Sequence, residues 1–140
     1  MSKNRVTLEE AEKFHGHLGP YLILGIIAGD IALNNLRCKK YFGLEVKVWG
    51  VNRKPKSCLV DGLQLSTGAT YGKGNIIKLN SPMIKIEFTN CKNRKKIVLR
   101  CKGDLMKKLE STKNHRDCES LARRLYSTDC GKLFNLQLTT

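Results

Sequence analysis

The segment from Tyr21 to Leu36 constrains the fold most strongly, because its apolar residues fall on nearly every side of a helix. Such a helix is stable in a folded protein when other elements cover it all round. Asp30, Asn34 and Asn35 interrupt it, and a membrane span needs about 18 to 20 uninterrupted apolar residues. The sequence therefore predicts a central buried helix near residues 20–36 and no membrane association.

Small residues recur three or four positions apart in this segment, at Gly25, Ala28, Gly29 and Ala32. Residues with that spacing share one face of a helix. Because the face is nearly bare of side chains, another backbone can approach it closely. The sequence predicts tight packing against a partner element here.

Two predicted helices meet at the Gly19-Pro20 pair, and the residues around it mark where each begins or ends. Thr7 and Glu10 match a capping box, which predicts a helix that begins near Leu8 and ends around Gly16. Pro20 suits the first position of the buried helix.

Periodicity predicts the remaining elements. Apolar and polar residues alternate in several short segments, as in half-buried strands, and Ser57 precedes a helical segment as a candidate N-cap. The predicted strands are 44–51, 76–79, 83–89 and 96–101, the predicted helices are 59–67, 104–110 and 117–126, and residues 132–138 form a last strand or an extended arm. This order favours an α+β fold, a single domain over residues 1–140 with a mainly antiparallel sheet packed by helices.

The chain is strongly basic, with 26 Lys and Arg against 12 Asp and Glu among 140 residues and a formal charge of +14. Ten of the basic residues lie within 91–116. Such a face attracts nucleic acid, an acidic protein or an anionic substrate, or is simply a solvated surface, and charge alone does not decide. The segment from Lys92 to Arg116 has no aromatic residue to stack bases, so nucleic acid is not the favoured partner.

Six cysteines occur at irregular spacing and without any Cys-x-x-Cys pair. The basic N-terminal residues are followed by Glu9, Glu10 and Glu12 where a secretory signal would be apolar. We therefore expect a cytoplasmic protein with reduced thiols. Cys38, Cys91, Cys101, Cys118 and Cys130 are interpreted as structural.

His15 and His17 lie between a helix end and the Gly19-Pro20 break, where imidazoles can point into a cavity. Together with a Cys58 thiolate they would suit a transition metal. The alternative is that both histidines cap backbone carbonyls at the helix C-terminus. His115 is expected to face solvent.

Cys58 falls in the first turn of a predicted helix. The helix dipole, Lys54 and Lys56 are expected to lower the pKa of its thiol and make it a candidate reactive thiolate. Asp61, one turn further on, can accept a hydrogen bond from a histidine ring and fix its tautomer. The alternative is a buried structural cysteine beside a surface aspartate.

The segment 67–75 is rich in glycine and hydroxyl groups. Its residues Thr67, Thr70, Lys73 and Asn75 are candidates for binding an anion or an anionic substrate. A plain glycine turn explains the same composition, and the order of residues is not that of a Walker loop.

Three segments, 14–20, 57–64 and 67–75, resemble in sequence and order the FmdE family of formylmethanofuran dehydrogenase proteins. The resemblance covers roughly residues 7–110 and leaves 111–140 as a short helical extension. It implies an α+β domain, often dimeric, with a cavity in which His15, His17 and Cys58 bind a transition metal, typically zinc, beside Asp61. Family members often have cysteine where this chain has Ala69, and some have a C-terminal zinc-binding module. This chain has neither, and the missing thiol at Ala69 implies weak zinc binding or none.

The leading hypothesis is a metal-binding protein linked to one-carbon metabolism, in which His17 and Cys58 hold the ion, His15 assists and Asp61 orients a ligand. It would work as a homodimer with a redox or one-carbon enzyme as partner. If it is an enzyme, the reactive group is the Cys58 thiolate or a metal-activated water, with Asp61 orienting a ligand. The alternative is a non-catalytic basic module that binds RNA or an acidic protein. A third hypothesis is a scaffold protein that retains a relic cavity.

Overall fold

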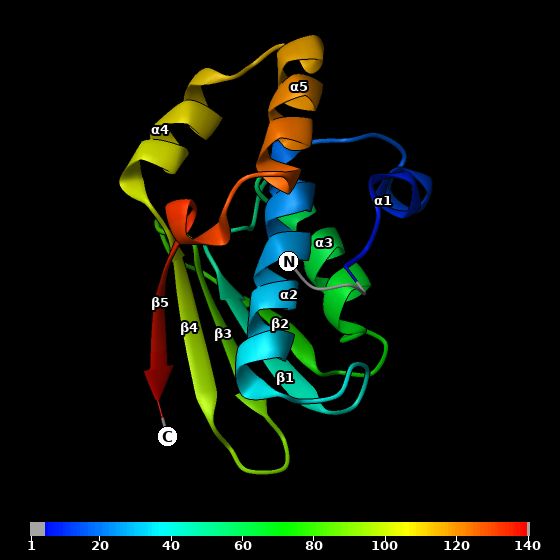
Figure 1. Cartoon of the computed structure of the whole chain (residues 1–140), viewed down its shortest axis with the longest axis vertical. Helices are drawn as coiled ribbons and strands as arrows, with labels where there is room; N and C mark the ends of the chain where they lie inside the picture. Colours follow the sequence, from blue (N-terminus) through cyan, green and yellow to red (C-terminus); the bar gives the residue numbers. More distant parts are fainter. Residues whose placement is uncertain (1–4, 140) are drawn as a thin grey trace.

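The computed structural model describes residues 5–139 as alternating groups of helices and strands (Figure 1). The helices are α1 Leu8–His15, α2 Pro20–Leu36, α3 Cys58–Thr67, α4 Gly103–Ser111 and α5 His115–Tyr126, with a 3-10 turn at Cys130–Lys132. The strands are β1 Leu44–Trp49, β2 Ile76–Leu79, β3 Lys85–Asn90, β4 Lys96–Cys101 and β5 Phe134–Thr139.

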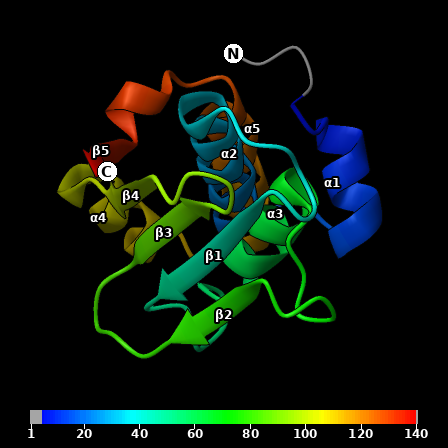
Figure 2. The same ribbon diagram turned by 90° about the horizontal axis from the view of Figure 1, so that it is seen from below.

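The strands form one sheet in the order β2-β1-β3-β4-β5. Strands β1 and β2 are parallel, and the other neighbours are antiparallel. Figure 2 shows α2, α3 and α5 on the same side of this sheet. The predicted α+β fold with a mainly antiparallel sheet is confirmed.

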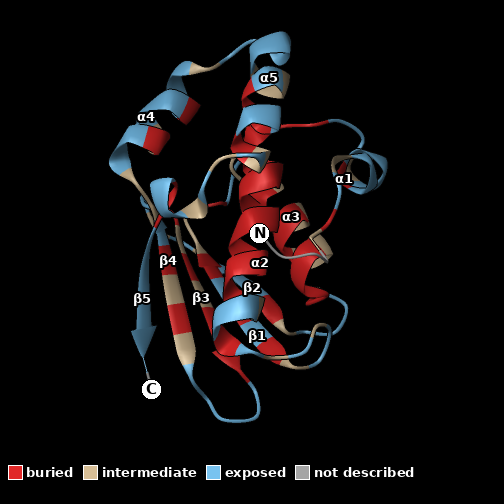
Figure 3. Ribbon diagram, viewed as in Figure 1, coloured by how far each residue is buried: buried red, intermediate tan, exposed pale blue. Residues whose placement is uncertain are grey.

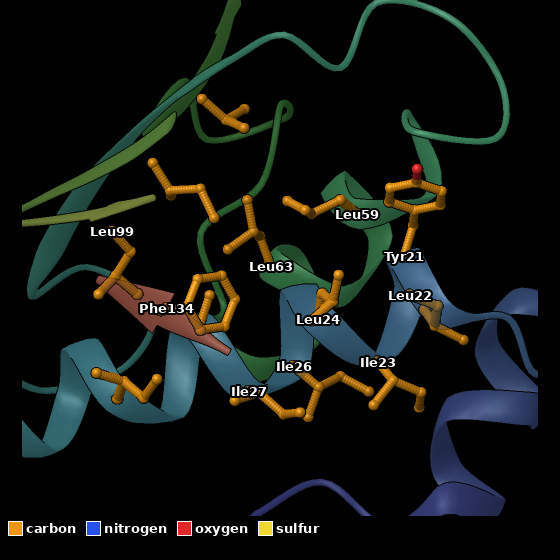
Figure 4. Packing of buried hydrophobic residues seen from close by; sticks show 14 of the residues in the cluster. Tyr21, Leu22, Ile23, Leu24, Ile26, Ile27, Leu59, Leu63, Leu99 and Phe134 are labelled. Atoms are coloured by element: carbon orange, nitrogen blue, oxygen red, sulfur yellow. The ribbon is translucent and has the colours of Figure 1, made fainter. Parts of the chain in front are cut away.

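Helix α2 lies at the centre of the helical layer. It is buried from Pro20 to Ala32, and Figure 3 shows burial along almost its whole length. Its side chains pack with those of α3, β4 and β5 in the core cluster of Figure 4. Among residues 5–139, no helix is both long and apolar enough to cross a membrane. The predicted central buried helix is confirmed.

The bare face of α2 packs directly against the backbone of α3. A Cβ added to Gly25 would lie 2.9 Å from the Cα of Gly62 and would collide with the carbonyl oxygen of Leu59. A Cβ on Gly62 would collide with the carbonyl oxygen of Leu22. The predicted tight partner is therefore α3, and two glycines permit the contact.

The boundaries of α1 follow its capping residues. The Thr7 hydroxyl accepts a hydrogen bond from the Glu10 amide, and the Glu10 carboxylate accepts one from the Thr7 amide, both at 3.1 Å. Gly16 ends the helix in a left-handed conformation with φ 103°. Both predicted boundaries are confirmed.

The first amides of α3 have hydrogen-bond acceptors other than the predicted one. Ser57 occupies the N-cap position as predicted, but it has helical dihedral angles and its hydroxyl makes no cap hydrogen bond, so the predicted capping contact is wrong. The amides of Leu59 and Val60 donate instead to the carbonyls of Lys56 and Ser57, each at 3.1 Å. The preceding turn thus uses the amides that a capping hydroxyl would have served.

Residues 111–140, predicted as a short helical extension, contribute to the core as far as the structure describes them. Helix α5 packs along α2 through the buried Leu121, Ala122 and Leu125. Strand β5 pairs with β4 from Phe134 to Thr139. The predicted tail is therefore a strand of the main sheet.

We predict that Gly25→Ala lowers the free energy of unfolding by about 3 kcal/mol or more, because the new methyl group meets backbone that has no rotamer to change. Gly103→Ala is the matched control, since a Cβ at this first residue of α4 has no atom within 4 Å. It should leave stability unchanged or raise it by up to about 1 kcal/mol. Urea denaturation followed by circular dichroism measures both, and equal stabilities for the two variants would contradict the packing described.

Candidate functional site

A surface hollow of about 210 Å³ lies where the α1–α2 connection, the start of α3 and the start of α5 meet. All three histidines of the chain line it. The lining residues are His15, His17, Gly19, Pro20, Tyr21, Pro55, Cys58, Lys113, His115 and Cys118. The structure thus brings together the predicted site residues His15, His17 and Cys58.

His15 is held by Asp61 from the first turn of α3. Its ring Nδ1 lies 2.6 Å from the Asp61 Oδ2 atom. Because a carboxylate accepts hydrogen bonds, Nδ1 carries the proton, and in the neutral ring Nε2 keeps a free lone pair. This Nε2 atom is buried and has no hydrogen-bond partner among the described residues. The predicted contact between Asp61 and a histidine is therefore present, and it involves His15.

The other two histidines extend from His15 as a row of rings. The ring centroids of His15 and His17 are 4.9 Å apart, and those of His17 and His115 are 5.8 Å apart. His115 is exposed as predicted, but its ring faces His17. Sequence reasoning missed this role for His115.

Cys118 was also missed, since it was interpreted as a structural residue. Its sulfur lies 3.6 Å from the carbonyl oxygen of Thr112, and its side chain lines the hollow. His115 and Cys118 are three residues apart on α5, so they share a helical face. That spacing was the available sequence signal.

Cys58 lines the hollow, but its thiol is not the activated group that the sequence suggested. Burial, followed by the nearby Asp61 carboxylate, raises the pKa of Cys58, while Lys54 lowers it less. The predicted lowering of this pKa is wrong, because desolvation outweighs the lysine at the start of the helix. In the metal-free protein Cys58 is a neutral thiol at pH 7.

Tyr21 forms the buried side of the hollow. Burial, with smaller contributions from Glu110 and neighbouring thiols, raises the pKa of Tyr21 to about 12. Its hydroxyl therefore remains protonated at neutral pH and can donate a hydrogen bond.

The residues predicted to bind an anion lie elsewhere and bond mainly to their own loop. The Thr67 hydroxyl donates to the Leu63 carbonyl at 2.7 Å, and the Asn75 side-chain oxygen accepts from the Thr70 amide at 3.0 Å. The Lys73 ammonium donates to the Gly68 carbonyl. These contacts fit a glycine turn, while Thr70 and Lys73 also line a second hollow between α1 and the end of α3, so anion binding by these residues stays a prediction.

Ala69 is fully buried just beyond the end of α3, whereas Cys58 begins that helix. The 10 residues of α3 span about 15 Å. Ala69 does not line the hollow. The inference that a thiol missing at Ala69 weakens this site is therefore wrong, because a cysteine there would lie at the opposite end of the helix.

The donors in the hollow do not form a preassembled metal cage. Within residues 5–139, no group of three or more His, Cys, Asp and Glu side chains is spaced to hold a metal ion. All six cysteines are free thiols. A metal would have to draw the exposed His17 and the Cys58 side chain toward His15.

Comparisons with known proteins agree with the fold. A sequence model of the family described as "FmdE, Molybdenum formylmethanofuran dehydrogenase operon" matches residues 14–135. The crystal structure of an FmdE-like protein of tungsten formylmethanofuran dehydrogenase type from Syntrophus aciditrophicus superimposes with a TM-score of 0.62 at 18% identity, covering 94% of this chain and 69% of that one. At that identity the likeness shows a shared fold.

A curated relative from Archaeoglobus fulgidus is described as a "Probable S-adenosyl-L-methionine-binding protein". It is 32% identical over 81 residues, which are 56% of this chain and 22% of the relative. The aligned part is thus about a fifth of the length of that protein.

We predict that alkylation of Cys58 by iodoacetamide accelerates about tenfold per pH unit from pH 6 to pH 8, because only the thiolate reacts and the pKa of Cys58 is raised above its usual value. Peptide mapping by mass spectrometry separates Cys58 from the other cysteines. A rate that levels off below pH 8 would indicate a low pKa and contradict the burial described.

Proposed function

The chain belongs to the FmdE family, and from this membership together with the hollow around His15 we propose that it is a transition-metal-binding protein related to the FmdE proteins of formylmethanofuran dehydrogenase. The observation that carries the proposal is the buried Nε2 atom of His15, which lacks a partner among the described residues while Nδ1 is held by Asp61. A buried polar atom left without a hydrogen bond is costly unless a ligand satisfies it.

The chemical types of the donors fit a metal of the zinc class. We assign His15 Nε2 as the first ligand, with His17 and the Cys58 sulfur completing the protein ligands. Imidazole and thiolate together suit zinc, and a carboxylate behind the histidine is the usual support for such a ligand. When bound, zinc would supply Lewis-acid polarisation of a ligand in the hollow.

The surrounding residues have separate tasks in this proposal. Asp61 fixes the tautomer and the orientation of His15. Cys58 releases its proton when it becomes a ligand, since the raised pKa keeps the free thiol neutral. Tyr21 donates a hydrogen bond from its protonated hydroxyl toward whatever occupies the hollow.

The expected metabolic role, oligomeric state and partner of this protein rest on the family resemblance alone. A role in one-carbon metabolism, a homodimer, a redox or one-carbon enzyme partner and a cytoplasmic location all stay predictions. The free thiols are compatible with a reducing compartment.

We predict that the protein purified without added metal or chelator contains a transition-metal ion, and that His15→Ala and Cys58→Ala each weaken zinc affinity about tenfold or more. Asp61→Asn should weaken it about 10- to 100-fold, because it removes the support of His15 without removing a ligand. Elemental analysis and competition with a zinc indicator measure these quantities.

Cys91→Ala is the matched control, since it removes an exposed cysteine that does not line the hollow. It should bind zinc as the unaltered protein does. Absence of metal from the purified protein together with unchanged zinc affinity in His15→Ala would exclude the proposed site.

A further inference from the structure

Four phenylalanine and tyrosine side chains are well exposed, and two of them, Phe14 and Tyr41, line a second hollow. Phe14, Tyr41, Phe42 and Tyr71 are 53%, 59%, 77% and 49% exposed, respectively. The other phenylalanines and tyrosines, Tyr21, Phe88, Tyr126 and Phe134, are buried or partly buried. The fold therefore brings to one surface aromatic residues that lie far apart in the sequence.

This second hollow, of about 420 Å³, lies between α1 and the end of α3. Glu10 and Phe14, four apart on one face of α1, form this wall together with Val6, which precedes the helix. The opposite wall comes from the α2–β1 connection, the end of α3 and the loop that follows it. Its residues are Lys40, Tyr41, Gln64, Leu65, Gly68, Thr70 and Lys73.

Tyr41 is held in place although its ring is exposed. Its backbone is left-handed with φ 74°, a conformation that side chains of this size rarely adopt. Its amide donates to the Thr67 carbonyl at 2.8 Å, its carbonyl accepts from the Asn75 side chain at 2.6 Å, and its ring lies against Gly68. The surrounding contacts thus fix an aromatic ring toward solvent at a backbone cost, as is common in binding sites.

Phe42 and Tyr71 are near residues that line the second hollow. The Lys73 ammonium lies 5.3 Å from the centroid of the Phe42 ring, within the range of a cation–π interaction. The Tyr71 amide donates to the Gln64 side chain at 3.1 Å. The Phe42 ring thus lies beside Lys73 of the lining, and Tyr71 directly follows the lining residue Thr70 in the loop after α3.

The charge of the walls favours an anionic ligand. Lys40 and Lys73 are the cationic residues of the lining, and Glu10 is the acidic one. The Glu10 carboxylate accepts hydrogen bonds from the amide and the hydroxyl of Thr7 and keeps its negative charge, so the two lysines leave the lining with one net positive charge. The formal charge of +14 on the whole chain also attracts anionic ligands to the protein.

We propose that this aromatic hollow binds single-stranded nucleic acid, with bases stacked on the rings of Tyr41, Phe42 and Tyr71 and with phosphates near Lys40 and Lys73. Aromatic platforms within a positive groove are the usual means of binding single strands without sequence preference. Several separate rings suit consecutive bases of a strand better than one mononucleotide. The basic segment 92–116 supplies long-range attraction for the strand. That segment has no aromatic residue, so in this proposal the rings at the aromatic hollow provide the stacking.

Fluorescence anisotropy with a labelled oligothymidylate of about 12 nucleotides tests the proposal. We expect binding that weakens steeply as salt rises from about 50 to 200 mM. Phe42→Ala and Tyr71→Ala should each weaken affinity about fivefold or more, and Phe42→Trp should retain it, because tryptophan also stacks. Phe42 is the most exposed of the rings, so its removal leaves the core intact, and circular dichroism verifies this.

Met83→Ala is the matched control, because Met83 is 70% exposed and does not line this hollow. It should bind the oligonucleotide as the unaltered protein does. The proposal is overturned by absence of binding at low salt, by full affinity in both Phe42→Ala and Tyr71→Ala, or by equal affinity for thymidine monophosphate and the oligonucleotide.

Discussion

The close contact between α2 and α3 determines where the other elements can lie. Gly25 and Gly62 let the two backbones touch, and this places the start of α3 beside the connection that leads from α1 into α2. Cys58 and Asp61 are on that first turn of α3, so Asp61 reaches His15 across 46 positions of sequence. A larger residue at either glycine would separate the helices and with them the carboxylate from the imidazole.

The docking of α5 on α2 adds a third wall to the same hollow. Leu121, Ala122 and Leu125 bury one face of α5 against the core. The start of this helix then lies over the α1–α2 connection, which brings His115 to His17. The C-terminal part of the chain thus contributes to the site through its packing, although its sequence resembles a plain surface extension.

Local rules predicted much of the fold, because the residues concerned act on their neighbours in sequence. The Thr7 capping box, Gly16 and Pro20 set the helix boundaries as expected. The errors concern quantities set by tertiary surroundings. Desolvation by the packed start of α3 reversed the expected pKa shift of Cys58, and the length of α3 separates Ala69 from the hollow. The pairing of His115 with His17 also depends on packing that no local pattern encodes.

Helix α1 stands between the two hollows and connects them physically. Phe14 and His15 are consecutive, and successive residues of a helix point about 100° apart, so one side chain lines the aromatic hollow and the other the histidine hollow. Ala11 is the buried residue of α1, and the Asp61 contact ties the end of the helix to α3. Because one short helix carries a wall of each hollow, a displacement of α1 changes both together. The hydrogen bond between His15 and Asp61 therefore stabilises the position of Phe14 as well as the tautomer of the histidine.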